Sequence, residues 1–70
     1  MKITVNPPGL LPDLVNWLRR NRCFAYAVGV GRCCVLYEVR HDPKEVEVEL
    51  NFCLRAWQMR HHGSMAQLTA

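Results

Sequence analysis

Apolar residues recur along the chain with two different periods, and the period separates predicted strands from predicted helices. Residues 2–6 alternate polar and apolar side chains, which predicts a short strand that stops at Pro7. Residues 10–21 instead place leucine and tryptophan on one stripe at helical spacing, with Asn21 available as a C-cap. The first third of the chain is therefore expected to form a strand followed by a helix.

Two segments rich in β-branched and aromatic residues, 23–30 and 33–40, are predicted to form a hairpin around a Gly31-Arg32 loop. Directly paired residues share a face of the sheet. In this register the core face carries Phe24, Tyr26, Val28, Val30, Cys33, Val35, Tyr37 and Val39. The opposite, open face carries Cys23, Ala25, Ala27, Gly29, Cys34, Leu36, Glu38 and Arg40.

The stretch from Glu45 to Leu50 alternates like a strand, but its flanks predict a helix over residues 43–62. Asp42-Pro43 is an N-cap residue followed by a proline at the first helical position, and Glu45 occupies the capping-box position. An apolar stripe at helical spacing follows, formed by Val46, Leu50, Cys53, Leu54, Trp57 and His61. Gly63 is expected to end the helix, and residues 64–69 are expected to form a last edge strand.

The predicted element order is β-α-β-β-α-β, with no internal repeat or linker. This arrangement resembles the ferredoxin-like fold, a split β-α-β sandwich. The resemblance implies one α+β domain over residues 1–70. It also implies an antiparallel sheet in the order 4-1-3-2 with both helices on one face.

Composition narrows the classes of function. The chain has 70 residues, half of them apolar, and a net charge of +3, which suits one soluble domain and excludes a multidomain enzyme. No apolar run reaches the ~18 residues of a membrane span, and the first residues lack the apolar core of a secretory signal. A cytoplasmic protein is therefore expected. No residue pattern identifies a reaction, so we expect a non-enzymatic protein without a cofactor.

The four cysteines, at positions 23, 33, 34 and 53, allow three interpretations. A disulfide framework needs a secretory context, and a zinc site needs paired ligands at short spacing. Neither is evident, so reduced thiols packed as small apolar groups are the preferred interpretation, ahead of disulfides and a metal site. A pair of Cys33 and His61 lacks a third orienting group, and no catalytic residue is predicted.

Two apolar surfaces remain outside the predicted core and indicate a partner, most simply a second copy in a homodimer. The back of the second helix carries Val48, Phe52, Ala56 and Met59. The open sheet face carries Ala25, Ala27, Cys34 and Leu36. The uncharged strand at 23–30 is also predicted at a sheet edge, where strand addition is possible. A small interaction or regulatory domain that associates with itself or with another protein is therefore the main hypothesis.

Nucleic acid is the alternative partner. Phosphate contacts need cations, and the ends of the helices are predicted to gather Arg19, Arg20, Arg22 and Arg40. A ferredoxin-like RNA-binding protein also stacks bases on aromatic side chains of its open sheet face. Because Phe24, Tyr26 and Tyr37 are predicted to point into the core, the sequence favours the protein partner.

Overall fold

The computed structural model describes residues 1–36 and 42–69 and contains the predicted order of elements. Strand β1 spans Lys2–Asn6, and a 3-10 turn, η1, at Pro8–Leu10 leads into helix α1 at Leu11–Arg20. Strands β2 (Phe24–Gly29) and β3 (Arg32–Leu36) form the hairpin. Helix α2 spans Pro43–Arg60, and strand β4 spans Met65–Thr69. Only η1 has no counterpart in the sequence prediction.

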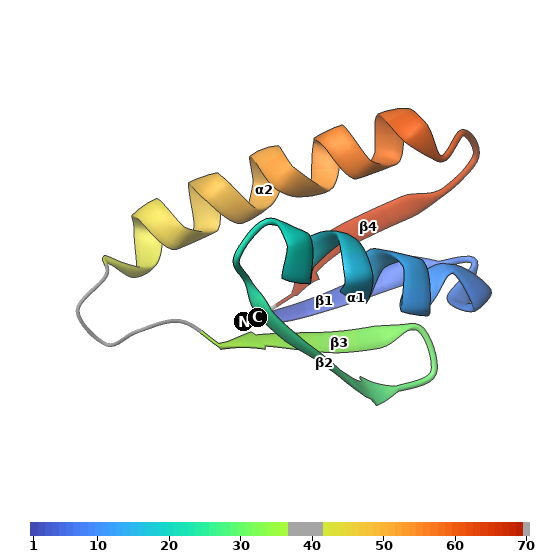
Figure 1. Cartoon of the computed structure of the whole chain (residues 1–70), viewed down its shortest axis with the longest axis horizontal. Coiled ribbons are helices and arrows are strands. Elements are labelled where there is room, and N and C mark those ends of the chain that lie inside the picture. The colour runs from blue at the N-terminus through green and yellow to red at the C-terminus, as the bar shows by residue number, and fades with distance from the viewer. Residues whose placement is uncertain (37–41, 70) are drawn as a thin grey trace.

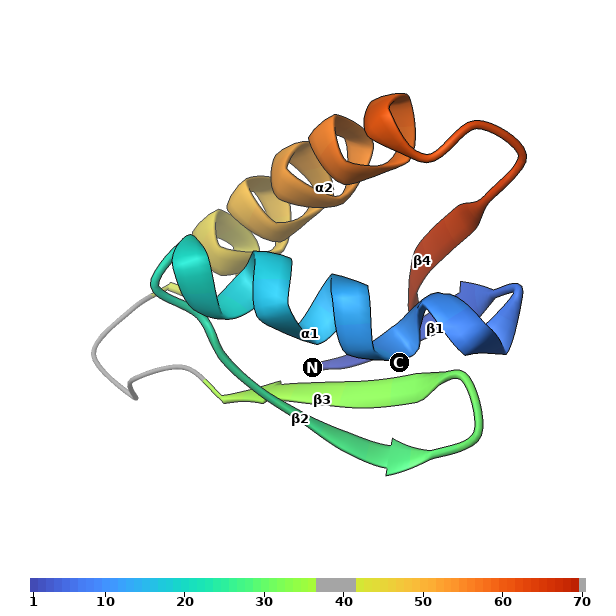
Figure 2. The same cartoon turned by 45° about the vertical axis from the view of Figure 1, so that its right-hand side comes forward.

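The four strands form one antiparallel sheet in the order β2-β3-β1-β4, which confirms the predicted order. Both helices lie on the same side of this sheet, and α2 crosses above α1 and β4 (Figure 1). Among residues 1–36 and 42–69, no helix lies on the other side of the sheet (Figure 2). The fold is the expected two-layer α+β sandwich.

The helix boundaries follow from local chemistry. The Asp42 carboxylate accepts a hydrogen bond from the backbone N–H of Lys44 at 2.9 Å, and Pro43 takes the first helical position of α2. At the end of α1, the Asn21 side chain donates to the carbonyl oxygen of Trp17 at 2.8 Å. The Asp42-Pro43 cap overrides the strand-like alternation of residues 45–50.

The core lies between the sheet and the helices. Trp57, Leu14, Leu18 and Leu54 are fully buried and come from both helices, and Ile3 and Cys33 meet them from β1 and β3. The predicted inner stripe of α2 is confirmed, since Leu50, Leu54 and Trp57 are its buried residues. Burial of large side chains between two layers is the main stabilising term for a domain of this size.

The hairpin differs from the prediction in register. The loop consists of Val30 and Gly31, so that Gly29 pairs with Arg32. A further irregularity lies between Ala27 and Gly29, beyond which Ala25 pairs with Val35 and Phe24 with Leu36. Tyr37 and Val39, the expected partners of Tyr26 and Phe24, lie outside the described residues. All four predicted pairs are wrong. Cys33 and Val35 pair with Ala27 and Ala25 instead of Val30 and Val28, and Tyr26 and Phe24 pair with Cys34 and Leu36 instead of Tyr37 and Val39.

Gly31 explains this register. Its φ is +66°, and a Cβ there would lie 2.9 Å from the carbonyl oxygen of Val5 and 3.0 Å from Cβ of Pro8. The Val5 N–H also donates to the Gly31 carbonyl at 2.7 Å. The glycine must therefore take the second position of the loop, next to β1, whereas the sequence pattern placed it first.

The shift reverses the faces of β2 but not those of β3. Ala25 is buried against the helices, whereas Phe24 and Tyr26 point away from them on the open face. Cys33 and Val35 are buried and Leu36 is exposed, as expected. The prediction that Ala25 belongs to an open, partner-binding face is therefore wrong, because an odd shift in register moves each side chain of a strand to the other face.

Candidate interaction surface

The outer face of α2 is apolar and exposed, as the sequence predicts. Phe52 is 78% exposed, Met59 77% and Val48 69%, and Ala56 is half-buried. These four residues lie opposite the buried stripe of Leu50, Leu54 and Trp57, so α2 has two apolar faces and buries only one. Large apolar side chains gathered on one face of a monomer are typical of an interaction surface.

A groove of about 700 Å³ runs beside this outer face. It lies between the N-terminal half of α2, the end of α1 and the ends of β2 and β3. Its lining is mostly apolar and comprises Trp17, Asn21, Arg22, Cys23, Phe24, Val35, Leu36, Val46, Val48, Glu49, Leu50, Phe52, Cys53 and Ala56. The groove joins the outer face of α2 to Leu36 and Phe24 at the sheet end, two surfaces that the sequence presents as separate.

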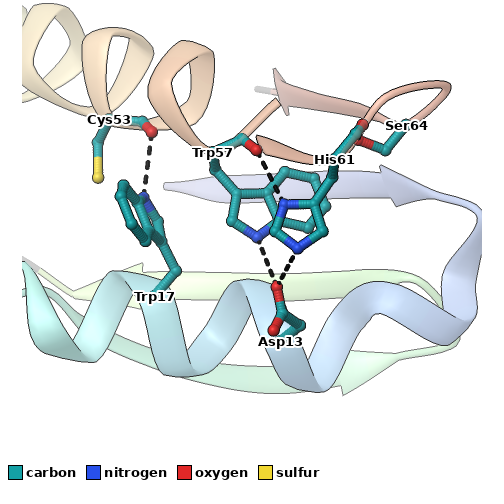
Figure 3. Close-up of polar contacts among 6 residues, drawn as sticks. All are labelled: Asp13, Trp17, Cys53, Trp57, His61 and Ser64. Atoms are coloured by element: carbon teal, nitrogen blue, oxygen red, sulfur yellow. Dashed lines mark hydrogen bonds and ion pairs between the residues drawn. The ribbon is translucent and has the colours of Figure 1, made fainter. Parts of the chain in front are cut away.

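Two contacts of Trp17 hold α2 beside α1 at the groove. The indole N–H of Trp17 donates to the carbonyl oxygen of Cys53 at 3.2 Å (Figure 3). The guanidinium carbon of Arg60 lies 4.8 Å from the centre of the Trp17 ring, a cation–π contact. Sequence reasoning placed Trp17 on the inner stripe of its helix but gave it no role in the site. Its side chain forms one wall of the groove.

Asp13 fixes the other end of α2. Its Oδ2 accepts the indole N–H of buried Trp57 at 3.0 Å and lies 2.6 Å from Nε2 of His61 (Figure 3). Nδ1 of His61 lies 2.9 Å from the carbonyl oxygen of Trp57, and the two rings stack at 4.4 Å. Ser64 donates to the His61 backbone carbonyl rather than to the ring. His61 thus lies between the Asp13 carboxylate of α1 and the Trp57 carbonyl of α2, and the cluster acts as a clamp between the two helices.

All four cysteines are free thiols, which agrees with the preferred interpretation of the sequence. Burial raises the pKa of Cys33 to about 11, and the neighbouring Cys34 adds to the shift. Burial also raises the pKa of Cys23 and of Cys53, both of which line the groove. These three groups are thiols, not reactive thiolates, at neutral pH. Within residues 1–36 and 42–69, no cluster of three or more metal-ligating side chains forms.

The remaining predicted site residues are distributed as follows. Ala27 is exposed but shares the core-side register of Ala25, so it does not join the open face either. Cys34 is half-buried and Leu36 exposed on the open face, as expected. Arg19, Arg20 and Arg22 are exposed at the end of α1 and just after it. Arg40 lies outside the described residues.

Comparison with protein-family models, with curated proteins and with solved structures finds no match for this chain. In the part of the chain that the structure describes, no helix is long and apolar enough to cross a membrane.

Proposed function

We propose that this protein is a small interaction domain that forms a homodimer by packing the outer face of α2 against the same face of a second copy, in antiparallel orientation. The observation that carries this proposal is the self-complementary pattern of that face. Phe52 lies near the middle of α2, between an acidic N-terminal half and a basic C-terminal half.

The apolar part of the pattern supplies the driving force. Burying one exposed Phe side chain contributes on the order of 1.5–3 kcal/mol, and a twofold interface buries each such residue twice. Val48, Phe52 and Ala56 follow one another at i, i+4 spacing, which forms a continuous ridge on the helix surface. Ridges of this kind pack into the grooves of a second helix.

The charges favour a second copy as the occupant. Glu45, Glu47 and Glu49 precede Phe52, whereas Arg55 and Arg60 follow it. In an antiparallel pair centred on Phe52, the acidic half of each helix lies beside the basic half of the other. A parallel pair would place like charges together, and an unrelated apolar partner would leave these charges without a role.

The groove extends the same surface. Phe52 and Val48 form its rim on α2, and Phe24 and Leu36 form its rim on the sheet. The second copy would cover this rim as it packs on α2. A Phe side chain has a total area of about 150–250 Å², and Phe24 and Phe52 expose about three quarters of theirs. Each of the two rings therefore presents on the order of 150 Å² of apolar area. A standard interface buries about 800 Å² on each partner, and the outer face and the rim together provide a large part of it.

We place this dimer in the cytoplasm. Free thiols, one of them in the core, suit a reducing compartment, because an oxidising one favours disulfides.

Sedimentation equilibrium of the wild type and two variants tests the dimer. The wild type is expected to show concentration-dependent mass between one and two copies. Phe52→Glu is expected to weaken the dimer by at least about 100-fold, since it places a charge at the centre of an apolar contact. Asn51→Glu adds the same charge at an exposed neighbouring position and is expected to change the dimer little. A wild type that sediments as a monomer at millimolar concentration would falsify the proposal.

Charge reversal tests the antiparallel orientation. Glu49 and Arg55 lie three residues before and after Phe52, so Glu49 of one helix lies at the same level as Arg55 of the other in an antiparallel pair. Glu49→Lys alone and Arg55→Glu alone are each expected to weaken self-association. An equimolar mixture of the two variants is expected to recover it as a heterodimer. Salt is expected to weaken the wild-type dimer, whereas a parallel pair, which places like charges together, would gain from screening.

A further inference from the structure

Two aromatic side chains project from the open face of the sheet, on the side opposite the helices. Phe24 is 75% exposed and Tyr26 43%, and both come from β2. The sequence pattern predicts them inside the core, which is one of the reasons why the sequence favours a protein over a nucleic acid. The observed register turns both rings outward and removes that objection.

The same face carries positive but no negative charge among the residues that the structure describes. The register places Lys2 of β1, Arg32 of β3 and the polar side chains of Thr4, Gln67 and Thr69 on this face. The acidic residues of the described ranges are Asp13 on α1, Asp42 at the cap of α2 and the three glutamates of α2. Within residues 1–36 and 42–69, the helix layer thus holds the acidic side chains, and the charged side chains of the open face are positive.

The rings and the cations lie within reach of one short ligand. Tyr26 pairs with Cys34, and Cys34 pairs with Lys2, so Lys2 lies two strands from the Tyr26 ring, about 10 Å away. Phe24 lies two residues before Tyr26 on the same strand, about 7 Å away. Arg22 lies two residues before the start of β2 and lines the same groove as Phe24, so its positive charge lies near that ring. Stacking surfaces with flanking cations are the two elements that bind an unpaired strand of nucleic acid.

We propose that the open face of the sheet binds single-stranded nucleic acid, with bases stacked on Tyr26 and Phe24 and phosphates contacted by Lys2, Arg32 and Arg22. A duplex keeps its bases stacked on one another and offers no free base to a ring, so single strands are the preferred ligand. The α2 face proposed for the dimer lies in the other layer. Phe24 and Arg22 also line the groove that a second copy would cover, whereas Tyr26, Lys2 and Arg32 are not part of its lining. Binding at Tyr26, Lys2 and Arg32 is therefore compatible with the dimer, which would carry two such sites.

Fluorescence anisotropy with labelled 12-mers of uridine and thymidine tests this site. Tyr26→Ala is expected to weaken binding by about 5- to 150-fold, the effect of losing one stacked base, and Tyr26→Phe is expected to keep it. Arg32→Ala is expected to reduce the slope of log K against log salt by about 0.7, the contribution of one phosphate contact to a single strand. Lys44→Ala removes a cation from α2 instead and is expected to leave the slope unchanged.

Three results would overturn the inference. The first is a wild type that does not bind either oligonucleotide at 50 mM salt. The second is unchanged binding by Tyr26→Ala together with loss of binding by Arg20→Ala, which would place nucleic acid at the end of α1 instead. The third is a change in sedimentation with Tyr26→Ala in a Phe52→Glu background, which would make the open face a protein interface. Circular dichroism of each variant establishes that it is folded.

Discussion

The Nε of Arg19 donates a hydrogen bond to the carbonyl oxygen of Ala25 at 3.2 Å, and this contact covers part of the free edge of the sheet. The N–H and C=O of Val35 on β3 both form hydrogen bonds with Met1, on the side of β1. Val35 therefore has no backbone hydrogen bond left for Ala25, its partner on β2. The N–H and C=O of Ala25 consequently point away from β3, toward the free edge of the sheet. The opposite edge is covered in the same way. Gln58 of α2 donates to the carbonyl oxygen of Ala66 on β4 at 3.0 Å. A helix side chain thus occupies one carbonyl of each edge strand, which opposes addition of a further strand.

Removal of the Arg19 contact is therefore expected to promote aggregation. Arg19→Met keeps an apolar stem over β2 but leaves the Ala25 carbonyl open to another chain. We expect a loss of about 1 kcal/mol in the free energy of unfolding and faster growth of light scattering on warming. Arg20→Met is the matched control, because Arg20 is an exposed neighbour on the same helix. Equal scattering by the two variants would show that Arg19 does not protect the edge.

The clamp formed by Asp13 is expected to contribute to stability. Asp13→Ala leaves the fully buried Trp57 indole N–H without its acceptor, which costs about 1–3 kcal/mol in the free energy of unfolding. Asp13→Asn keeps an oxygen acceptor but loses the charge facing His61, so a smaller loss is expected. Urea denaturation measures both, with Asn16→Ala on the exposed side of α1 as control. A loss no larger for Asp13→Ala than for Asn16→Ala would contradict the clamp.

Gly31 combines two constraints that a set of three variants can separate. Gly31→Ala forces a positive φ on alanine and places its Cβ against Val5 and Pro8, so we expect a loss of at least about 2 kcal/mol. Gly63 has a φ of +81° but open space around it, so Gly63→Ala is expected to lower the free energy of unfolding by about 1 kcal/mol through the backbone conformation alone. Gly9→Ala has neither constraint. Thermal denaturation should rank the three variants in that order, and equal losses for Gly31→Ala and Gly63→Ala would show that the close contact has no effect.

Sequence patterns within single elements predict most of the fold, but they do not predict the register of the β2-β3 hairpin. The Asp42-Pro43 cap, the stripe of α2 and the alternation of β1 are set by residues within one element, and each prediction from them is confirmed. The register of β2 depends on Gly31 packing against β1, a contact between residues far apart in the sequence. The alternation of residues 23–30 fits either face, because both of its halves are uncharged. The packing of Gly31 against β1 selects between them.

Of the candidate surfaces, one can be predicted from a single element, whereas the others depend on contacts between elements. The outer face of α2 follows from helical periodicity, so the exposure of Val48, Phe52 and Met59 is readable in the sequence. The groove needs the end of α1 to meet α2, and the aromatic platform needs the register of β2. The pairing of Asp13 with His61 joins residues 48 positions apart, and the sequence signals only that each lies near a helix end.

Cys33 is expected to make stability depend on pH in the alkaline range. Burial raises its pKa from an ordinary value of 9.0 to about 11. Between these values the unfolded chain releases the thiol proton while the folded chain keeps it, so the folded state loses stability as pH rises. The contribution is fully present below pH 9, and about 1 kcal/mol should be lost by pH 10. Cys23 and Cys53 add a loss of the same sign, because their pKa values are also raised.

Urea denaturation under reducing conditions at pH 7, 9 and 10 measures this dependence. Cys33→Ala lowers stability at every pH because it leaves a small cavity, but the fall between pH 9 and 10 should become shallower. Cys34→Ala, the neighbouring and less buried thiol, serves as the control and should keep most of the wild-type fall. A fall that is identical in Cys33→Ala and the wild type would show that the buried thiol is not its source.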